Sequence, residues 1–136
     1  MRGLNRVQIM GNLGADPEMR YTPTGRAVTQ FRVAVSRRWR DAEGQSQEKT
    51  EWFRVVTWGR TAEVANQYLE KGAPVYVDGR LQTRSYEGGD GQTRYITELI
   101  AREMILLPRG NGRPAASEEE IERAEETEEE EVEIPL

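Results

Sequence analysis

The amino-acid sequence predicts an all-β domain, built as a small closed barrel of five strands with a single helix. Apolar and polar residues alternate with a period of two along five stretches of the 136-residue chain, as in half-buried strands. Glycine, proline and aspartate cluster between these stretches and mark turns. One segment, residues 61–71, changes to the helical period, and it lies between the third and fourth stretches.

The first two predicted strands cover residues 5–13 and 28–39. Two glycines near the end of the first strand indicate a bend, as where a strand curls around a barrel. In the second strand, simple alternation places Trp39 with the core residues Phe31 and Val33. Trp39 can face outward only if the strand bulges or extends beyond the barrel at its consecutive arginines, and the sequence leaves both open.

The third predicted strand, residues 50–60, has two different faces. One is an ordinary apolar core face. The other presents two indole rings with a guanidinium between them, and it consists of Trp52, Arg54, Val56 and Trp58. Flat aromatic surfaces next to fixed positive charge are suited to binding single-stranded nucleic acid.

The helix predicted over residues 61–71 has one apolar face, which consists of Val64, Ala65, Tyr68 and Leu69. Thr61 is placed to cap its start and Gly72 to end it. Tyr68, like Tyr95 further on, is expected in the core or at a subunit interface.

The last two predicted strands cover residues 74–86 and 93–107, joined by a glycine-rich hairpin tip at residues 87–91. Alternation turns Leu81 inward together with the valines before it. It places three other side chains together on the outward face, namely Arg80, Arg84 and Tyr86. Either arginine can equally pair with a surface carboxylate.

This order of elements is that of the OB-fold, a five-stranded Greek-key barrel whose helix falls between strands three and four. OB-folds bind oligonucleotides or oligosaccharides across strands two and three and the adjoining loops. The predicted aromatic residues lie on these strands and on the last hairpin. The architecture by itself leaves the class of ligand open.

The composition excludes several kinds of chemistry. The chain has no cysteine and no histidine, which removes thiol and imidazole nucleophiles, a histidine base and zinc sites of the Cys/His kind. The body shows no spaced cluster of carboxylates, so we expect no metal, no cofactor and no enzymatic activity. No apolar segment marks export or membrane insertion, so a cytoplasmic protein without a membrane partner is expected.

The net charge of −5 averages two unlike parts of the chain. Residues 1–114 hold 18 Lys and Arg against 13 Asp and Glu, whereas residues 115–136 hold 1 against 11. A basic body therefore precedes an acidic tail. Only two of the basic residues are lysines, and arginine favours bidentate phosphate contacts and stacking.

Several segments resemble the bacterial single-stranded DNA-binding protein family. They include Thr-Glu-Trp-Phe-Arg-Val-Val-Thr-Trp-Gly-Arg at 50–60 and Val-Tyr-Val-Asp-Gly-Arg-Leu-Gln-Thr-Arg-Ser-Tyr at 75–86. Residues 7–21 and 62–72 match the family as well, and the resemblance covers residues 3–107. It implies an OB-fold that assembles as a homotetramer and wraps single-stranded DNA without sequence preference.

The resemblance also implies the residues that contact DNA. The family's stacking aromatics fall on Trp39, Trp52, Trp58 and Tyr86, of which position 58 is commonly phenylalanine and position 86 commonly tryptophan. Its cationic contacts fall on Arg6, Arg54, Arg60, Lys71 and Arg84. We add two phosphate contacts: Arg38, which is next to Trp39, and Arg80, which shares the outward face of Tyr86.

The end of the chain resembles the family's acidic, hydrophobic docking tip for replication and repair proteins. We expect an OB domain over residues 1–108, a short flexible acidic linker over 109–128 and the docking tip over 129–136. The tip residues are Glu131, Val132, Glu133, Ile134, Pro135 and Leu136, the last in place of a usual phenylalanine. The simpler alternative is a solvated acidic segment, but that has no use for terminal apolar residues.

Together these features predict a non-enzymatic protein of the bacterial cytoplasm and nucleoid. It binds and protects single-stranded DNA in replication, recombination and repair, and it recruits partner proteins through its tip. An OB-fold adaptor of the replication-restart type is the alternative, although such relatives typically lack an acidic tip. A nuclease is a third hypothesis, which the lack of histidine and of a carboxylate cluster disfavours.

Overall fold

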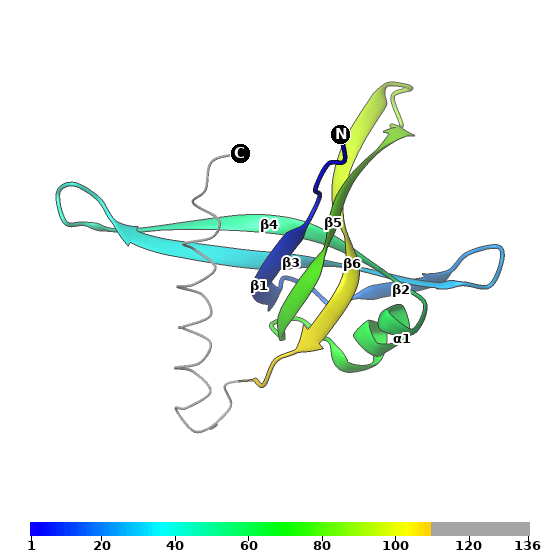
Figure 1. Cartoon of the computed structure of the whole chain (residues 1–136), viewed down its shortest axis with the longest axis horizontal. Coiled ribbons are helices and arrows are strands. Elements are labelled where there is room, and N and C mark those ends of the chain that lie inside the picture. The colour runs from blue at the N-terminus through cyan, green and yellow to red at the C-terminus, as the bar shows by residue number, and fades with distance from the viewer. Residues whose placement is uncertain (110–136) are drawn as a thin grey trace. The chain divides into compact units, whose positions relative to one another are not determined.

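The computed structural model describes residues 1–109, which include the compact unit Met1–Leu106. Its strands and single helix are labelled in Figure 1. In chain order they are β1 (Val7–Leu13), β2 (Glu18–Tyr21), β3 (Ala27–Arg40), β4 (Ser46–Trp58), α1 (Gly59–Tyr68), β5 (Pro74–Glu87) and β6 (Thr93–Leu106). Residues 110–136, with most of the predicted linker and the whole docking tip, lie outside the described part.

Five of the strands close into a barrel. The order across the sheet is β1-β5-β6-β4-β3-β2, and β1 also pairs with β3, which completes the ring. β4 and β6 run parallel, and the other paired strands run antiparallel. The predicted five-stranded barrel, with its helix between the third and fourth barrel strands, is therefore confirmed. The short strand β2, which extends the sheet beside β3, was not predicted as a strand.

Apolar side chains from the five barrel strands and from α1 fill the interior. Each fully buried aliphatic side chain contributes about 1.5–3 kcal/mol relative to exposure, so this cluster is the main stabilising element. Its members are Ile9, Leu13, Phe31, Val33, Val55, Ala65, Leu69, Ala73, Val75, Val77 and Leu99.

Two buried threonines hydrogen-bond within the barrel wall, and one of them attaches the helix to it. The Thr29 hydroxyl donates to the carbonyl oxygen of Ala62 on α1 at 2.7 Å. The Thr57 hydroxyl donates to the carbonyl oxygen of Thr29 at 2.9 Å. Because both hydroxyls are bonded, their burial carries no unsatisfied polar group.

β1 changes its partner strand at Asn12, next to Gly11. It pairs with β5 as far as Asn12 and with β3 from Asn12 onward. A Cβ at Gly11 would run into the carbonyl oxygen of Ala34 on β3, so only glycine permits this approach. The pairing of β1 with both β5 and β3 closes the barrel.

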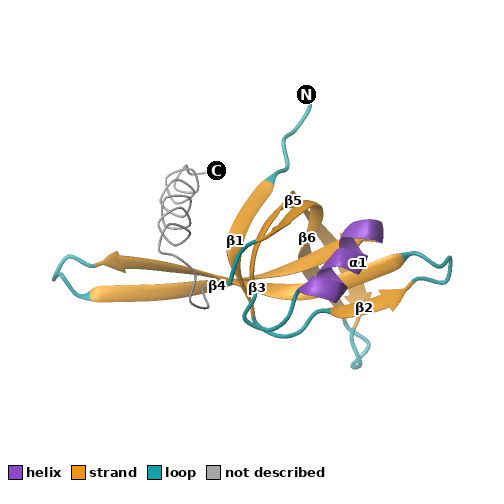
Figure 2. Cartoon of the chain, turned by 90° about the horizontal axis from the view of Figure 1, so that it is seen from below, coloured by secondary structure: helices purple, strands orange, loops and turns teal. Residues whose placement is uncertain are grey.

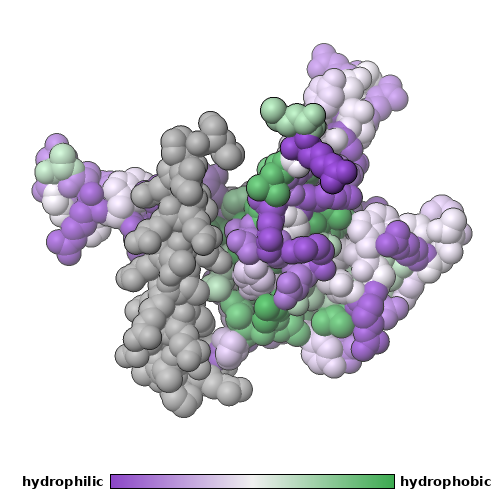
Figure 3. Space-filling view, in the orientation of Figure 1, coloured by the Kyte–Doolittle hydropathy of each residue, from purple (hydrophilic) through white to green (hydrophobic). Residues whose placement is uncertain are grey.

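Two hairpins extend well beyond the barrel. β3 and β4 stay paired to their tip, and from Ser36 to Lys49 the side chains of this ribbon are exposed apart from Asp41. β5 and β6 form a second projecting hairpin, in which residues 80–87 are exposed. Figures 1 and 2 show the β3–β4 tip on the side of the barrel away from α1. Figure 3 shows both projections mostly in the hydrophilic colours.

The helix differs from its prediction at both ends. It covers Gly59–Tyr68 in place of residues 61–71, and its N-cap is Trp58, without a side-chain capping bond. The predicted cap at Thr61 is therefore wrong. The reason is Gly59, whose φ of 61° turns the chain directly from β4 into the helix and leaves Thr61 inside the first turn.

For two side chains, the observed exposure is the opposite of the predicted one. Leu81 was expected inward, but it is 42% exposed because β5 has passed the end of β1 there. The Asn5 side chain hydrogen-bonds to the Leu81 backbone but leaves the leucine side chain exposed. Val56 was expected on the exposed face, but it is buried. The reason is that β4 is an inner strand at this point. Val56 pairs with Gln30 on β3 at one side and with Ile100 on β6 at the other.

Within residues 1–109, no helix is both long and apolar enough to span a membrane. The same residues contain no group of three or more acidic side chains that could hold a metal ion.

Candidate nucleic-acid interface

The four predicted stacking residues all present an aromatic ring at the surface, to different extents. Trp52 is 51% exposed, Tyr86 44% and Trp39 40%, whereas Trp58 is half-buried. Three of them lie on the β3–β4 ribbon, and Tyr86 lies on the other projecting hairpin. Exposed rings of this size are unusual in a domain with a well-filled core, and they offer stacking surfaces.

Trp39 reaches the surface because the strand extends beyond the barrel. The β3–β4 pairing runs without a shift from Val28↔Trp58 to Arg40↔Ser46, so no bulge turns Trp39 around. Its side chain therefore shares a ribbon face with the core residue Phe31, and it lies on the face opposite to Trp52. The two predicted stacking residues thus lie on different faces of one ribbon.

The ribbon tip contains a shallow hollow of about 530 Å³ around Trp39. It is lined by Arg38, Trp39, Arg40, Ser46, Gln47 and Glu48. The turn beyond it is held by Asp41, whose Oδ1 accepts from the backbone N–H groups of Glu43 and Gln45 at 3.0 and 2.9 Å. These bonds lower the pKa of Asp41, the Gln45 N–H contributing most.

The position of Trp52 depends on Gly14. A Cβ built at Gly14 would collide with the Cζ3 and Cη2 atoms of the Trp52 ring. The indole edge therefore lies directly against the backbone of the β1–β2 loop, where any side chain would displace it. On the same ribbon face, the neighbouring cross-strand pair is Arg32 and Arg54.

The predicted phosphate contacts divide into paired and unpaired cations. Arg6 donates from Nε and Nη2 to Asp78 at 3.3 and 2.8 Å, and Arg84 donates from Nε to Glu98 at 2.7 Å. Arg38 lies 3.8 Å from Glu48, a weak exposed pair. In the described part of the chain, no hydrogen bond or ion pair engages the guanidinium groups of Arg54, Arg60 and Arg80.

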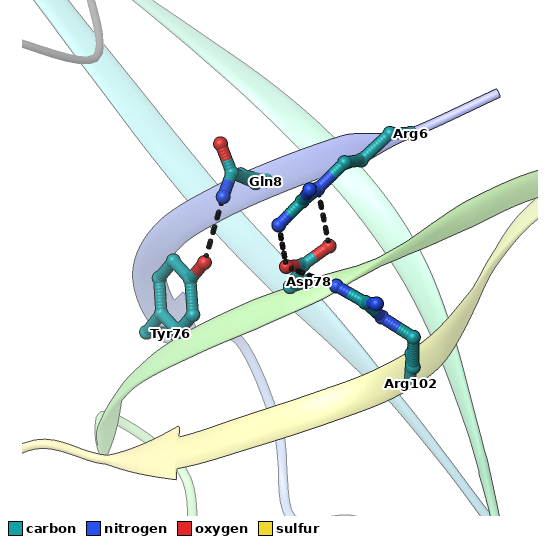
Figure 4. A network of polar contacts seen from close by, with 5 residues as sticks. All are labelled: Arg6, Gln8, Tyr76, Asp78 and Arg102. Atoms are coloured by element: carbon teal, nitrogen blue, oxygen red, sulfur yellow. Dashed lines mark hydrogen bonds and ion pairs between the residues drawn. The ribbon is translucent and has the colours of Figure 1, made fainter. Parts of the chain in front are cut away.

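Figure 4 shows that Arg6 belongs to a network on β1, β5 and β6. Arg102 donates to the same carboxylate at 3.0 Å, and Gln8 donates to the Tyr76 hydroxyl at 3.0 Å nearby. The hydrogen bond with Asp78 raises the pKa of Arg6, and it lowers the pKa of the buried Asp78. The contact with Asp78 gives Arg6 a structural role. A DNA phosphate would have to compete with the Asp78 carboxylate for this guanidinium.

The structure brings only some of the predicted residues together. Arg54 lies on the ribbon face of Trp52, and Arg84 and Arg80 lie on the strand of Tyr86. Arg38 lies next to Trp39 on β3. The other predicted cations are on other elements: Arg6 just before β1, Arg60 in α1 and Lys71 after the helix. The backbone N–H of Lys71 donates to Asp16 at 2.8 Å.

The sequence reasoning missed three arginines that lie over the tryptophan rings. The Cζ atoms are 4.9 Å from the ring centroid for Arg26 and Trp58, and 5.1 Å for Arg32 and Trp52. Arg37 lies 5.7 Å from the ring centroid of its neighbour Trp39. Finding the first two pairs requires the register of the hairpin, which the polar loop does not specify.

Comparison with other proteins agrees with this geometry. Residues 4–107 match the single-strand binding protein family. Among solved structures, the chain is similar to one titled "Plasmodium falciparum SSB complex with ssDNA", with a TM-score of 0.73 and 31% sequence identity. The match covers 79% of this chain and 98% of the Plasmodium chain. The chain therefore belongs to the single-strand binding protein family, whose members bind single-stranded DNA and are not enzymes.

Proposed function

We propose that this protein binds single-stranded DNA without reading its sequence, and protects it during replication, recombination and repair at the bacterial nucleoid. The observation that carries the proposal is the exposed surface of the β3–β4 ribbon, where Trp52 lies beside Arg32 and Arg54. The similarity to a Plasmodium protein solved with single-stranded DNA supports it.

The chemistry of this surface explains both affinity and lack of specificity. Stacking of a base on an aromatic ring contributes about 1–3 kcal/mol, and every base has a flat face to offer. Arginines add attraction to phosphates, which all nucleotides share. Duplex DNA keeps its base faces stacked inside, so the rings favour single strands.

A fluorescence titration tests the proposal. We expect oligo-dT to quench the tryptophan emission of the full chain, with log K falling linearly against log salt. A mixed-sequence single strand should bind with comparable affinity, and a duplex of the same length should bind far more weakly. Absence of binding to oligo-dT at low salt would contradict the proposal.

The homotetramer expected from the resemblance is part of the proposal. A single chain exposes several large apolar side chains outside the β3–β4 ribbon, among them Tyr68 at 61%, Tyr95 at 74% and Ile105 at 45%. Assembly would cover such residues. Sedimentation velocity, with and without a long dT oligomer at two salt concentrations, should show a tetramer in both cases, and a monomer without DNA would refute the assembly.

The acidic end of the chain is proposed to dock replication and repair proteins through Glu131, Val132, Glu133, Ile134, Pro135 and Leu136. Its carboxylates should also compete with DNA phosphates for the basic body. Deleting residues 129–136 should therefore leave the DNA affinity equal or higher, while pull-down of partner proteins is lost. Weaker DNA binding by the truncated chain would contradict the competition.

A further inference from the structure

Two tryptophans of the proposed binding surface have a ring face covered by an arginine. The guanidinium of Arg32 lies over Trp52 and that of Arg26 over Trp58. A base that stacks on an indole needs the same space above the ring. The arginines therefore occupy the positions where bases are expected to bind.

The two pairs have the same geometry in the β3–β4 ladder. Trp58 pairs with Val28, and Trp52 pairs with Ala34. In both cases the arginine stands two residues before the tryptophan's partner, on the same face of the ribbon. Side chains in this diagonal relation are within reach of each other when they are long or aromatic. The register of the hairpin thus builds the same arrangement at two places along the ribbon.

The charges on this face indicate an anionic ligand. Arg32 and Arg54 are directly opposite each other, and like charges in that position repel. Across residues 1–109, no carboxylate forms an ion pair with Arg26, Arg32 or Arg54. A phosphate that binds between the two opposed guanidinium groups would relieve their repulsion.

We propose that Arg26 and Arg32 are phosphate-binding residues that rest on Trp58 and Trp52 in the free protein and move to the DNA backbone when a base takes the ring. This inference rests on the proposed function. A cation–π contact at an exposed site is weak, so a base and a phosphate can replace it together. The long arginine side chain lets the guanidinium leave the ring while its Cα stays in the ladder.

The salt dependence of DNA binding tests this exchange. We compare the wild-type chain with the double variant Arg26→Gln and Arg32→Gln, using a short dT oligomer. The slope of log K against log salt should become shallower by about 0.7 for each phosphate that the variant no longer neutralises, so the two affinities converge as salt rises. Arg26→Lys with Arg32→Lys should restore the slope, because lysine also neutralises a phosphate.

A matched control and a second measurement separate the outcomes. Arg2→Gln removes one positive charge outside the β3–β4 ribbon, half the change in the double variant, and should leave the slope unchanged. In proton–nitrogen spectra, the Arg32 Nε–H signal should carry the ring-current shift of Trp52 in the free protein and lose it when dT is added. Failure of the wild-type chain to bind dT would instead refute the proposed function.

Three results would overturn the inference while wild-type binding stands. A tighter complex of the glutamine variant with an unchanged slope would mean that the arginines only shield the rings. A weaker complex with an unchanged slope would mean that the guanidinium stays stacked and holds the base from above. A ring-current shift that persists in the complex would also exclude the movement.

Discussion

Gly14 fixes the position of Trp52 by having no side chain. The indole edge lies where a Cβ at Gly14 would be, so the ring packs directly against the backbone of the β1–β2 loop and cannot move further toward it. This loop is outside the ribbon that carries Trp52, and the contact depends on the closed barrel. A ring whose position is fixed in advance loses less conformational entropy when a base stacks on it.

The variant Gly14→Ala tests this role. The added methyl group should displace the Trp52 ring, and dT affinity should fall by a part of the stacking energy of about 1–3 kcal/mol. Emission of the free protein should shift as well, because the ring changes its surroundings. Gly3→Ala, at a glycine with nothing within 4 Å of the added Cβ, is the control and should behave as wild type. Equal affinities for both variants would disprove the role.

Asp78 on β5 is a buried carboxylate that links Arg6, just before β1, to Arg102 on β6. It is 1% exposed and accepts from Arg6 and Arg102, whose side chains are 52% and 67% exposed. The Arg6 hydrogen bond contributes most to lowering its pKa. Because the folded pKa is below the unfolded one, the stabilisation is complete at neutral pH and is lost as the pH falls through the folded pKa.

Asp78→Asn should therefore lower the free energy of unfolding at neutral pH, toward the lower end of about 1–3 kcal/mol since water screens both arginines. The difference from wild type should shrink as the pH falls below about 4, where the unfolded carboxyl is protonated. Urea denaturation at several pH values measures it. Asp90→Asn, in an exposed turn, is the control. A difference that stays constant down to pH 2 would contradict this explanation.

Alternation predicts the face of the strand on which a side chain lies, but its exposure depends on which neighbouring strands are present. It placed Trp52 and Arg54 outward, where they lie, but it failed at Val56 and Leu81. Their exposure depends on where β6 begins to pair with β4 and where β1 ends, which are long-range properties. The bulge at Arg102, which brings this residue to Asp78, left no signal in the sequence either.

At the scale of elements, the β3–β4 ribbon divides into a part that supports the fold and a part that is proposed to bind DNA. Its barrel part contributes Phe31, Val33 and Val55 to the core, and its outer part contributes exposed arginines and Trp39. The ladder continues through both parts without a shift. The outer part is therefore held by hairpin pairing and by the Asp41 turn, with little support from the core.

Shortening the ribbon tests this separation. Residues 38–48 can be replaced by Asn-Gly, a pair suited to a two-residue hairpin turn, between Arg37 and Lys49. The free energy of unfolding should change by less than about 1 kcal/mol, because no core residue is removed. DNA affinity should fall by about 1–3 kcal/mol with the loss of Trp39. A strongly destabilised chain, or an unchanged affinity, would argue against this division.

The sequence predicted the barrel strands because their alternation is long and regular. It could not predict the orientation of Trp39, since that depends on whether the ladder bulges or extends, and the structure shows that it extends. It placed the helix start at Thr61 because a side-chain cap was expected there. The positive φ of Gly59 makes that cap unnecessary, and single glycines rarely reveal their conformation in advance.

At the scale of the whole molecule, the described residues form a stable barrel that supports two projecting, arginine-rich hairpins. The barrel brings Trp52, Trp58 and their arginines onto one face of the ribbon, and it leaves Trp39 on the other. A strand that contacts both faces must pass around the ribbon. Such a path uses aromatic and cationic contacts in alternation, which suits binding without sequence preference.

The most direct test of the central claim is the dT affinity of the double variant Trp52→Ala and Trp58→Ala. Circular dichroism should first show that the barrel is folded, and Leu4→Ala, which truncates an exposed apolar side chain ahead of β1, is the control. We predict a loss of about 2–6 kcal/mol for two stacked bases, with reduced quenching of the remaining Trp39. A folded double variant that binds dT as tightly as wild type would contradict the stacking surface.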